Sequence, residues 1–279
     1  MTLRVMTWNV WWRFESPEER EEAILAVIEK ESPDVLCLQE VWAERRGEDQ
    51  VERFADALEY HAARTDGPWF EERSFGNAVL SRWPVIDAEQ HALPKDDGTP
   101  GHRRALYAVT DSPYGPIPVV SAHLEHRLDG TVVRRRQAAT LARVIADRRG
   151  DPDRDFPVIV GGDLNATPDS DEVRALTGRT APPVPGLLLM DCWEQAGDGT
   201  YGATWSSENP HVEWSAWPNR RLDYLFVSWP RPRPIGNPLR CWLSGTEPIN
   251  GVQPSDHYAV VADFETEGWD LDRSDVVSS

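Results

Sequence analysis

Lysine is nearly absent from this chain of 279 residues, which has only Lys30 and Lys95 against 47 acidic residues and carries a formal net charge of −18. A protein that grips duplex nucleic acid through many phosphates needs a basic surface, so this balance disfavours a nonspecific duplex binder. The charge does not exclude nucleic acid as a partner. Charges are screened over about 8 Å at physiological salt, so the cluster Arg134–Arg136 could bind a phosphate although the rest of the surface is acidic.

Cysteines and long apolar runs are also scarce. The three cysteines, Cys37, Cys192 and Cys241, are odd in number and widely spaced, which excludes a full disulfide framework and fits no zinc site. We expect free thiols, with Cys37 packed in the core. No apolar stretch approaches the roughly 20 residues that cross a bilayer, and the N-terminus reads as a strand instead of a signal peptide. We therefore expect a cytoplasmic protein without a membrane span.

The hydrophobic pattern that is present predicts alternating strands and helices. Ser16, Pro17 and Glu19 predict a capping box at the start of a first helix. Further helices are expected over residues 50–58, 136–148 and 171–176. Strands are expected over residues 2–8, 35–38, 60–64, 76–81, 105–110, 117–123, 156–160, 222–228 and 258–264.

The chain shows no internal repeat or long linker, and we expect one domain over residues 1–266. Residues 267–279 form an acidic tail without a buried pattern, for which we expect disorder. The segment 178–219 is rich in proline, glycine and tryptophan and is expected to be irregular. Its tryptophans are expected to pack in the core or in loops, and one or two could instead line a pocket.

The most informative stretch is Val158–Pro168, in which a buried β-branched run ends at Gly161 and Gly162. Asp163 and Asn165 follow two residues apart, and strand alternation would point both side chains to the same side. The glycines would let another group approach the backbone closely. An Asp/Asn-rich turn is the alternative that this segment alone would favour.

Other polar residues stand at the ends of the expected strands. Each one alone has an ordinary explanation as a turn residue, a cap or an ion-pair partner. As a set they combine carboxylates, carboxamides and imidazoles without a thiolate, and oxygen ligands of this kind suit magnesium beside a phosphate. Zinc is disfavoured because no His-x-x-x-His is present. The set is Asn9, Glu40, His123, Asp223, Asp256 and His257.

Seven short segments resemble, in order, those of the endonuclease/exonuclease/phosphatase superfamily, the group that contains deoxyribonuclease I. They are Thr7–Val10, Asp34–Val41, Gly76–Ser81, Ser121–Leu124, Gly162–Asn165, Arg221–Tyr224 and Ser255–His257. The resemblance implies an α/β (α+β) fold, a four-layer α/β/β/α sandwich with two mixed β-sheets packed face to face. Leu164 stands where many relatives have phenylalanine, a change of one apolar residue for another.

The resemblance also implies roles for the residues. Glu40 would be the main metal ligand, with Asn9 and Asp256 beside it, for Mg²⁺ or Mn²⁺ as a substitute. His257 would contact the scissile phosphate or act as base, oriented by Asp223.

On the other side of the phosphate, the resemblance implies that Asp163 positions or deprotonates the attacking water and that Asn165 binds a phosphate oxygen. His123 would stabilise the transition state or protonate the leaving oxygen, with Asn77 orienting it. Whether Asp163 or His257 is the base is left open. Arg103 and its neighbour Arg104 are either solvated or outer contacts of the phosphate, and the solvated alternative is favoured.

The sequence thus predicts a divalent-metal-dependent phosphoester hydrolase, most simply a phosphodiesterase or nuclease that directs water in line at phosphorus. One alternative is a phosphomonoesterase that acts on a small phosphorylated metabolite, which the acidic surface favours. A catalytically idle binding protein of the same fold is disfavoured, because every motif residue is present. The natural substrate and the oligomeric state are not determined by the sequence.

Overall fold

A computed structural model describes residues 2–215, 217–232 and 234–268. The strands form two six-stranded sheets and a small hairpin of β4 (Trp69–Phe70) and β5 (Arg73–Ser74). The first sheet consists of β13 (Pro238–Ser244), β14 (Ala259–Glu265), β1 (Thr2–Asn9), β2 (Val35–Val41), β6 (Gly76–Ser81) and β3 (His61–Arg64), in that order across the sheet.

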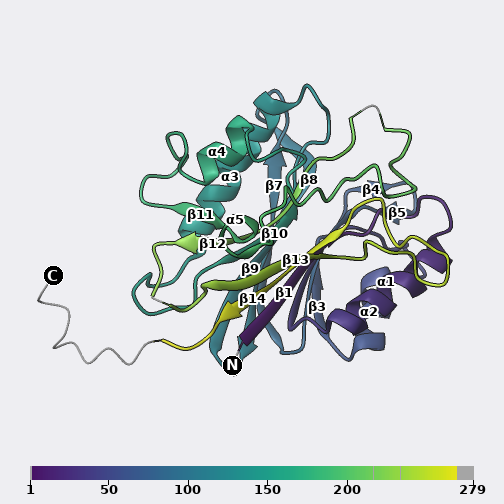
Figure 1. The fold of residues 1–279 in the computed structure, drawn as a ribbon, viewed down its shortest axis with the longest axis horizontal. Helices are drawn as coiled ribbons and strands as arrows, with labels where there is room; N and C mark the ends of the chain where they lie inside the picture. The colour runs from purple at the N-terminus through teal and green to yellow at the C-terminus, as the bar shows by residue number, and fades with distance from the viewer. Residues whose placement is uncertain (1, 216, 233, 269–279) are drawn as a thin grey trace, which may run out of the picture.

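The second sheet and the helices complete the architecture (Figure 1). The second sheet consists of β11 (Leu188–Asp191), β12 (Asp223–Trp229), β10 (Ile159–Asp163), β9 (Gly115–His123), β8 (Pro100–Ser112) and β7 (Val85–Pro94), in that order. The helices are α1 (Pro17–Glu31), α2 (Gln50–Leu58), α3 (Thr131–Arg148), α4 (Asp171–Leu176) and α5 (Cys192–Ala196).

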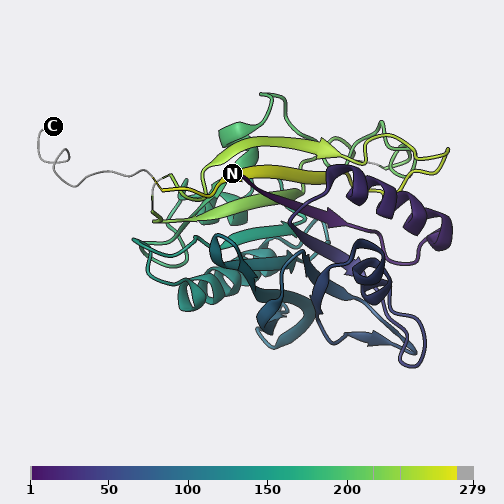
Figure 2. The same ribbon diagram turned by 90° about the horizontal axis from the view of Figure 1, so that it is seen from below.

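Helices cover the outer faces of the two sheets, as the two views of the ribbon show (Figures 1 and 2), and three apolar clusters lie between the resulting four layers. One cluster packs α1 and α2 on the outer face of the first sheet and includes Ile24 and Leu36. A second fills the space between the sheets, where Cys37 and Ile159 belong to one core. The third packs α3 and α4 on the outer face of the second sheet. Both sheets contain parallel and antiparallel pairs, so the predicted four-layer sandwich with mixed sheets is confirmed.

Several element predictions need correction. The side chain of Ser16 makes no capping hydrogen bond, so the predicted capping box does not form, although helix α1 does begin at Pro17. Helix α3 begins at residue 131, five residues earlier than predicted. Residues 82–104, for which no strand was predicted between the strands expected over 76–81 and 105–110, contain all of β7 and the start of β8. The segment 178–219 contains β11 and α5, and β13 was not predicted.

The three cysteines are free and buried, as predicted. Burial raises the pKa of the Cys37 thiol to about 12, as expected for a packed apolar side chain. Within the described residues, no helix is long and apolar enough to cross a membrane. The division into a domain of residues 1–266 and a tail stays a prediction, and residues 269–279 of that tail lie outside the described residues.

Candidate active site

The register of the second sheet places three of the predicted site residues in one row. Asp163, at the end of β10, pairs with His123 at the end of β9 in parallel register. On its other side Asp163 pairs with Asp223, the first residue of β12, in antiparallel register. Segments that are 40 and 60 residues apart in the sequence therefore bring a carboxylate, an imidazole and a second carboxylate to the same edge of the sheet.

Two glycines before Asp163 allow close packing around β10. A side-chain carbon on Gly161 would lie 2.8 Å from Cβ of Cys37 and 2.9 Å from Cβ of Thr7, both of which belong to the facing sheet. A side-chain carbon on Gly162 would lie 2.3 Å from the carbonyl oxygen of Ala122 in β9. The glycines therefore let the two sheets, and two strands within one sheet, approach each other closely below the site.

A bulge in the first sheet aims Glu40 at this row. The pairing of β2 with β6 shifts register between Gln39 and Val41, and Glu40 has a φ of 59°. Such a left-handed conformation is uncommon outside glycine and occurs at bulges that redirect a side chain. The side chain of Glu40 lies beside Asn9, whose Nδ2 donates to Oε1 of Glu40 at 3.2 Å and to Oδ2 of Asp163 at 3.1 Å.

The segment before β14 brings Asp256 and His257 to the same place. The hydroxyl of Ser255 donates to the carbonyl oxygen of Asn9 at 2.7 Å. The buried guanidinium of Arg20, on α1, donates to the carbonyl oxygens of Val10, which follows Asn9, and of Pro254, which precedes Ser255, at 3.0 Å each. These bonds hold the chain near its two ends together and fix the position of both predicted site residues.

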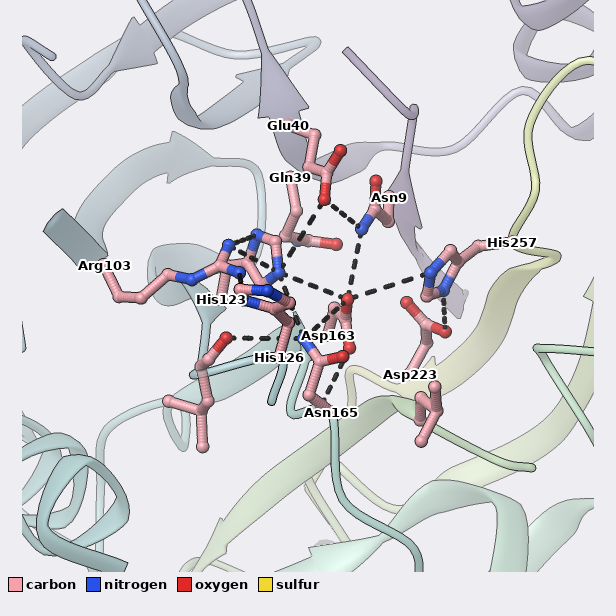
Figure 3. A network of polar contacts seen from close by, with 12 residues as sticks. Asn9, Gln39, Glu40, Arg103, His123, His126, Asp163, Asn165, Asp223 and His257 are labelled. Carbon is pink, nitrogen blue, oxygen red and sulfur yellow. Dashed lines mark hydrogen bonds and ion pairs between the residues drawn. The ribbon is translucent and has the colours of Figure 1, made fainter. Parts of the chain in front are cut away.

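Six of the nine predicted site residues line one pocket of about 440 Å³, and Asn9 is hydrogen-bonded to two of them, Glu40 and Asp163 (Figure 3). The lining residues are Trp11, Phe14, Glu40, Phe75, Arg103, His123, His126, Asp163, Asn165, Trp205, Arg220, Leu222, Asp256 and His257. Asp223 lies behind His257, in hydrogen-bond contact with it.

Asn77 lies outside the pocket lining, as Asn9 and Asp223 do, but unlike them its side chain makes no hydrogen bond to another predicted site residue. Its Nδ2 donates to the carbonyl oxygens of Arg104 at 2.8 Å and Ser121 at 3.2 Å. These bonds connect β6 of the first sheet to β8 and β9 of the second, so Asn77 joins the sheets below the site. Its position supports the strand that carries His123 and does not place its amide on the His123 ring.

The chain turns at Asn165 instead of continuing as a strand. Strand β10 ends at Asp163, and Asn165 has a φ of 50°. Oδ1 of Asp163 accepts from the backbone nitrogen of Asn165 at 2.8 Å, and Nδ2 of Asn165 lies 3.2 Å from Nε2 of His123. The two polar side chains do lie together, but an Asx-type turn brings them together and not the strand alternation that the sequence suggested.

Burial and mutual repulsion act on the carboxylates of the pocket. The pKa of Asp256 is raised to about 7, first by burial and then by the charges of Glu40 and Asp163, against the attraction of His257 and Arg20. The pKa of Asp163 is raised to about 6 by burial and by Asp223, while His257 lowers it. A cation bound among these carboxylates would offset their mutual repulsion and favour their ionised forms.

The two histidines that face Asp163 differ in charge. Although burial alone would lower it, the pKa of His257 is raised well above its ordinary value by Asp223, Asp256 and Asp163. Its Nδ1 lies 2.8 Å from Oδ2 of Asp223, which fixes the ring. Burial lowers the pKa of His123, with a further contribution from Arg103. These opposite shifts favour the charged form of the His257 ring and the neutral form of the His123 ring.

The donor set fits a divalent cation. Glu40, Asp163 and Asp256 present carboxylate oxygens to one pocket, which suits a hard ion. A second group, formed by Asp163, Asp223 and His257, has potential ligand atoms within 4.8 Å of one another. We assign that group to an ion pair, because Nδ1 of His257 already lies 2.8 Å from Oδ2 of Asp223, although Oδ1 of Asp223 is buried without a hydrogen-bond partner. In its present orientation Asn9 offers its amide nitrogen to the carboxylates, so its role as a ligand stays a prediction.

Two residues line the pocket although the sequence favoured another position for each of them. Arg103, for which a solvated position was favoured, lies over His123 with Nη1 at 2.8 Å from both ring nitrogens, and burial lowers its pKa. Trp205 packs edge-on against the ring of His257, with centroids 5.0 Å apart, so one of the tryptophans of the irregular segment does line the pocket. Of the others, Trp193 is buried, while Trp214 and Trp217 are exposed.

Comparisons with known proteins agree with this arrangement. The family model described as "Endonuclease/Exonuclease/phosphatase family" matches residues 6–257. An endonuclease/exonuclease/phosphatase from Beutenbergia cavernae DSM 12333 is similar in structure with a TM-score of 0.71 and 26% identity, over 95% of this chain and 71% of that chain. No curated protein matches the chain in sequence.

Two further solved structures share the fold at lower identity. D. rerio TDP2 complexed with a single strand DNA product has a TM-score of 0.73 and 19% identity, over 95% of this chain and 99% of that chain. The human Nocturnin catalytic domain with a bound sulfate anion has a TM-score of 0.69 and 20% identity, over 95% of this chain and 93% of that chain.

Proposed function

The chain belongs to the endonuclease/exonuclease/phosphatase family, and on that premise we propose that it is a magnesium-dependent phosphodiesterase. The observation that carries the proposal is a single pocket in which the buried Asp163 lies 3.9 Å from Nε2 of His257 and which is also lined by the carboxylates of Glu40 and Asp256. A neutral substrate would gain little from such charges, whereas phosphate transfer needs charge stabilisation and an oriented water.

The residue charges support a division of roles. At neutral pH a carboxyl group with a pKa of about 6 is mostly ionised, so Asp163 is the base that takes a proton from the attacking water. Nδ2 of Asn9 and the backbone nitrogen of Asn165 donate to its two oxygens and hold it in position. His257 is already protonated and is therefore the cation that meets the phosphate, held by Asp223.

The remaining groups suit the other phosphate oxygens. The neutral ring of His123 and the side-chain amide of Asn165 lie 3.2 Å apart, where both can donate to one oxygen. Mg²⁺ held by Glu40 and Asp256, with Asn9 as a further candidate, would neutralise charge on the phosphate. Mn²⁺ is the expected substitute.

The space around the site favours a diester over a small monoester. The pocket of about 440 Å³ adjoins a cleft of about 840 Å³ that shares Phe75, Arg103 and His126 with it. A small monoester would leave this cleft empty, whereas a diester has a second group to place. The presence of a DNA product in the TDP2 structure supports a nucleic-acid strand among the candidates. A cytoplasmic location stays a prediction from the N-terminal sequence.

A comparison of two esters tests the proposal. Purified protein with added Mg²⁺ should hydrolyse bis-p-nitrophenyl phosphate faster than p-nitrophenyl phosphate, measured as release of p-nitrophenolate. Turnover of the monoester alone would overturn the diesterase assignment and support the phosphomonoesterase. If neither ester nor single- or double-stranded nucleic acid is cleaved with any divalent metal, the protein is a binding member of the family.

A further inference from the structure

Arg103 lies where the pocket and the neighbouring cleft meet. Its side chain extends from β8 toward His123 (Figure 3). It lines both cavities, as do Phe75 and His126. The guanidinium lies over the ring of Phe75, with 5.5 Å between its central carbon and the ring centroid. A ligand that enters the pocket from the cleft therefore passes this guanidinium.

The contacts of Arg103 leave its positive charge without a direct counter-ion. Nη1 lies 2.8 Å from both ring nitrogens of His123, and Nη2 lies 3.1 Å from Nδ1 of His126. Among the residues that the structure describes, Arg103 forms no ion pair, although Glu40 and Asp163 act on it at longer range.

Other arginines that are removed from water are satisfied in a different way. Arg134 pairs with Glu172 at 2.5 Å, and Arg221 pairs with Asp191 at 2.6 Å. Arg20 donates to five backbone carbonyl oxygens. These three arginines thus have carboxylates that neutralise their charge or carbonyl oxygens that accept their N–H groups. The hydrogen-bond partners of the Arg103 guanidinium are the imidazole rings of His123 and His126.

We propose that Arg103 binds a non-bridging oxygen of the substrate phosphate at the junction of the pocket and the cleft. The inference rests on the proposed function and adds a contact that the family segments found in the sequence do not include. A guanidinium presents its N–H groups as a planar fork that matches two phosphate oxygens, and it keeps its charge when partly buried. Its position beside His123 places this fork next to the donors already assigned to the phosphate.

The next residue offers a matched control. Arg104 lies on the same strand, but its Nη1 donates to the carbonyl oxygens of Gly101 and Arg103, at 2.6 and 3.1 Å. Its side chain lines neither the pocket nor the cleft. Replacement of Arg104 by methionine removes the same charge from the same strand without changing the junction.

The test compares Arg103→Met, Arg103→Lys and Arg104→Met with the wild type, after thermal unfolding has shown which variants are folded. With bis-p-nitrophenyl phosphate and Mg²⁺, Arg103→Met should lower kcat/KM by about 100-fold, the effect of losing one donor to a developing phosphate charge. Arg103→Lys should recover part of the loss, and Arg104→Met should change kcat/KM by no more than about twofold.

Binding of orthophosphate in the presence of Mg²⁺, followed by calorimetry, gives a second readout that does not depend on turnover. It should weaken in Arg103→Met and stay unchanged in Arg104→Met. A folded Arg103→Met protein with wild-type kcat/KM and wild-type phosphate affinity would overturn the inference. If the wild type hydrolyses no ester, the proposed function fails, while the phosphate affinities of the two methionine variants still decide the role of Arg103.

Discussion

Replacement of Asp256 by asparagine should stabilise the metal-free protein at alkaline pH, although it removes a side chain that we place in the active site. Asp256 is buried, and its pKa is raised to about 7 by burial and by the charges of Glu40 and Asp163. An ordinary aspartate titrates at 3.8. The folded protein therefore holds this carboxylate in its charged form against its environment whenever the pH is high.

The sign and size of the effect follow from this difference. Because the pKa of the folded state lies above that of the unfolded state, Asp256 costs no stability below pH 4, and the cost grows as the pH rises toward 7. Above pH 7 the cost reaches about 4 kcal/mol, at 1.36 kcal/mol for each pH unit between 3.8 and about 7. An asparagine removes the charge but leaves a buried amide to satisfy, which costs about 1–3 kcal/mol. We expect a net gain of about 1–3 kcal/mol at pH 8, and none at pH 4.

The assay is urea unfolding followed by tryptophan fluorescence, in EDTA, at pH 4 and pH 8. Asp147 on α3 is exposed, and Asp147→Asn is the matched control, for which we expect no change above about 0.5 kcal/mol. Added Mg²⁺ should then stabilise the wild type more than Asp256→Asn, because ligand that binds only the folded state adds to its stability.

Two results would refute this reasoning. An Asp256→Asn protein that is less stable than the wild type at pH 8 in EDTA would show that the carboxylate is already neutralised within the fold. Equal stabilisation of both proteins by Mg²⁺ would show that Asp256 does not bind the ion.

Two further predictions concern the scaffold. Glu172→Ala should lower the free energy of unfolding by about 3–5 kcal/mol in urea titrations, because it leaves the buried guanidinium of Arg134 without its partner. Asp171→Ala, which removes an exposed ion pair from the same turn, should cost less than about 1 kcal/mol, and equal losses would contradict the argument. The native protein should not react with Ellman's reagent at pH 8, because burial raises the pKa of Cys37 and Cys241 to about 12, and all three thiols should react once guanidinium chloride unfolds the chain. Rapid reaction of a thiol in the native protein would contradict its buried position.

The sequence predicted central strands well because they carry continuous apolar runs. Strands β2 and β6 lie inside the first sheet, and their residues are almost all buried. In the two six-stranded sheets, the strands that were not predicted are β7, β11 and β13, and all three lie at sheet edges. An edge strand such as β7 exposes much of its surface and tolerates charged residues, so neither a continuous nor a cleanly alternating apolar pattern marks it.

In the site, too, local sequence patterns mark some residues, whereas the positions of others depend on how the strands pair. Strand ends identified Asp163 and His123, because the polar residues there interrupt apolar runs. The bulge that aims Glu40 depends on the pairing of β2 with β6, which no local pattern records. Arg103 looked like a solvated residue because its contacts with His123 arise only when β8 and β9 pair in their observed register.

The central claim is that Asp163 activates water beside a bound divalent ion, and initial rates of bis-p-nitrophenyl phosphate hydrolysis test it most directly. The wild type should be inactive in EDTA and recover with Mg²⁺ or Mn²⁺. Asp163→Asn and His257→Ala should stay folded and lose at least about 1,000-fold in kcat with the metal present. Wild-type turnover in EDTA, or near-wild-type rates in a folded Asp163→Asn protein, would contradict it.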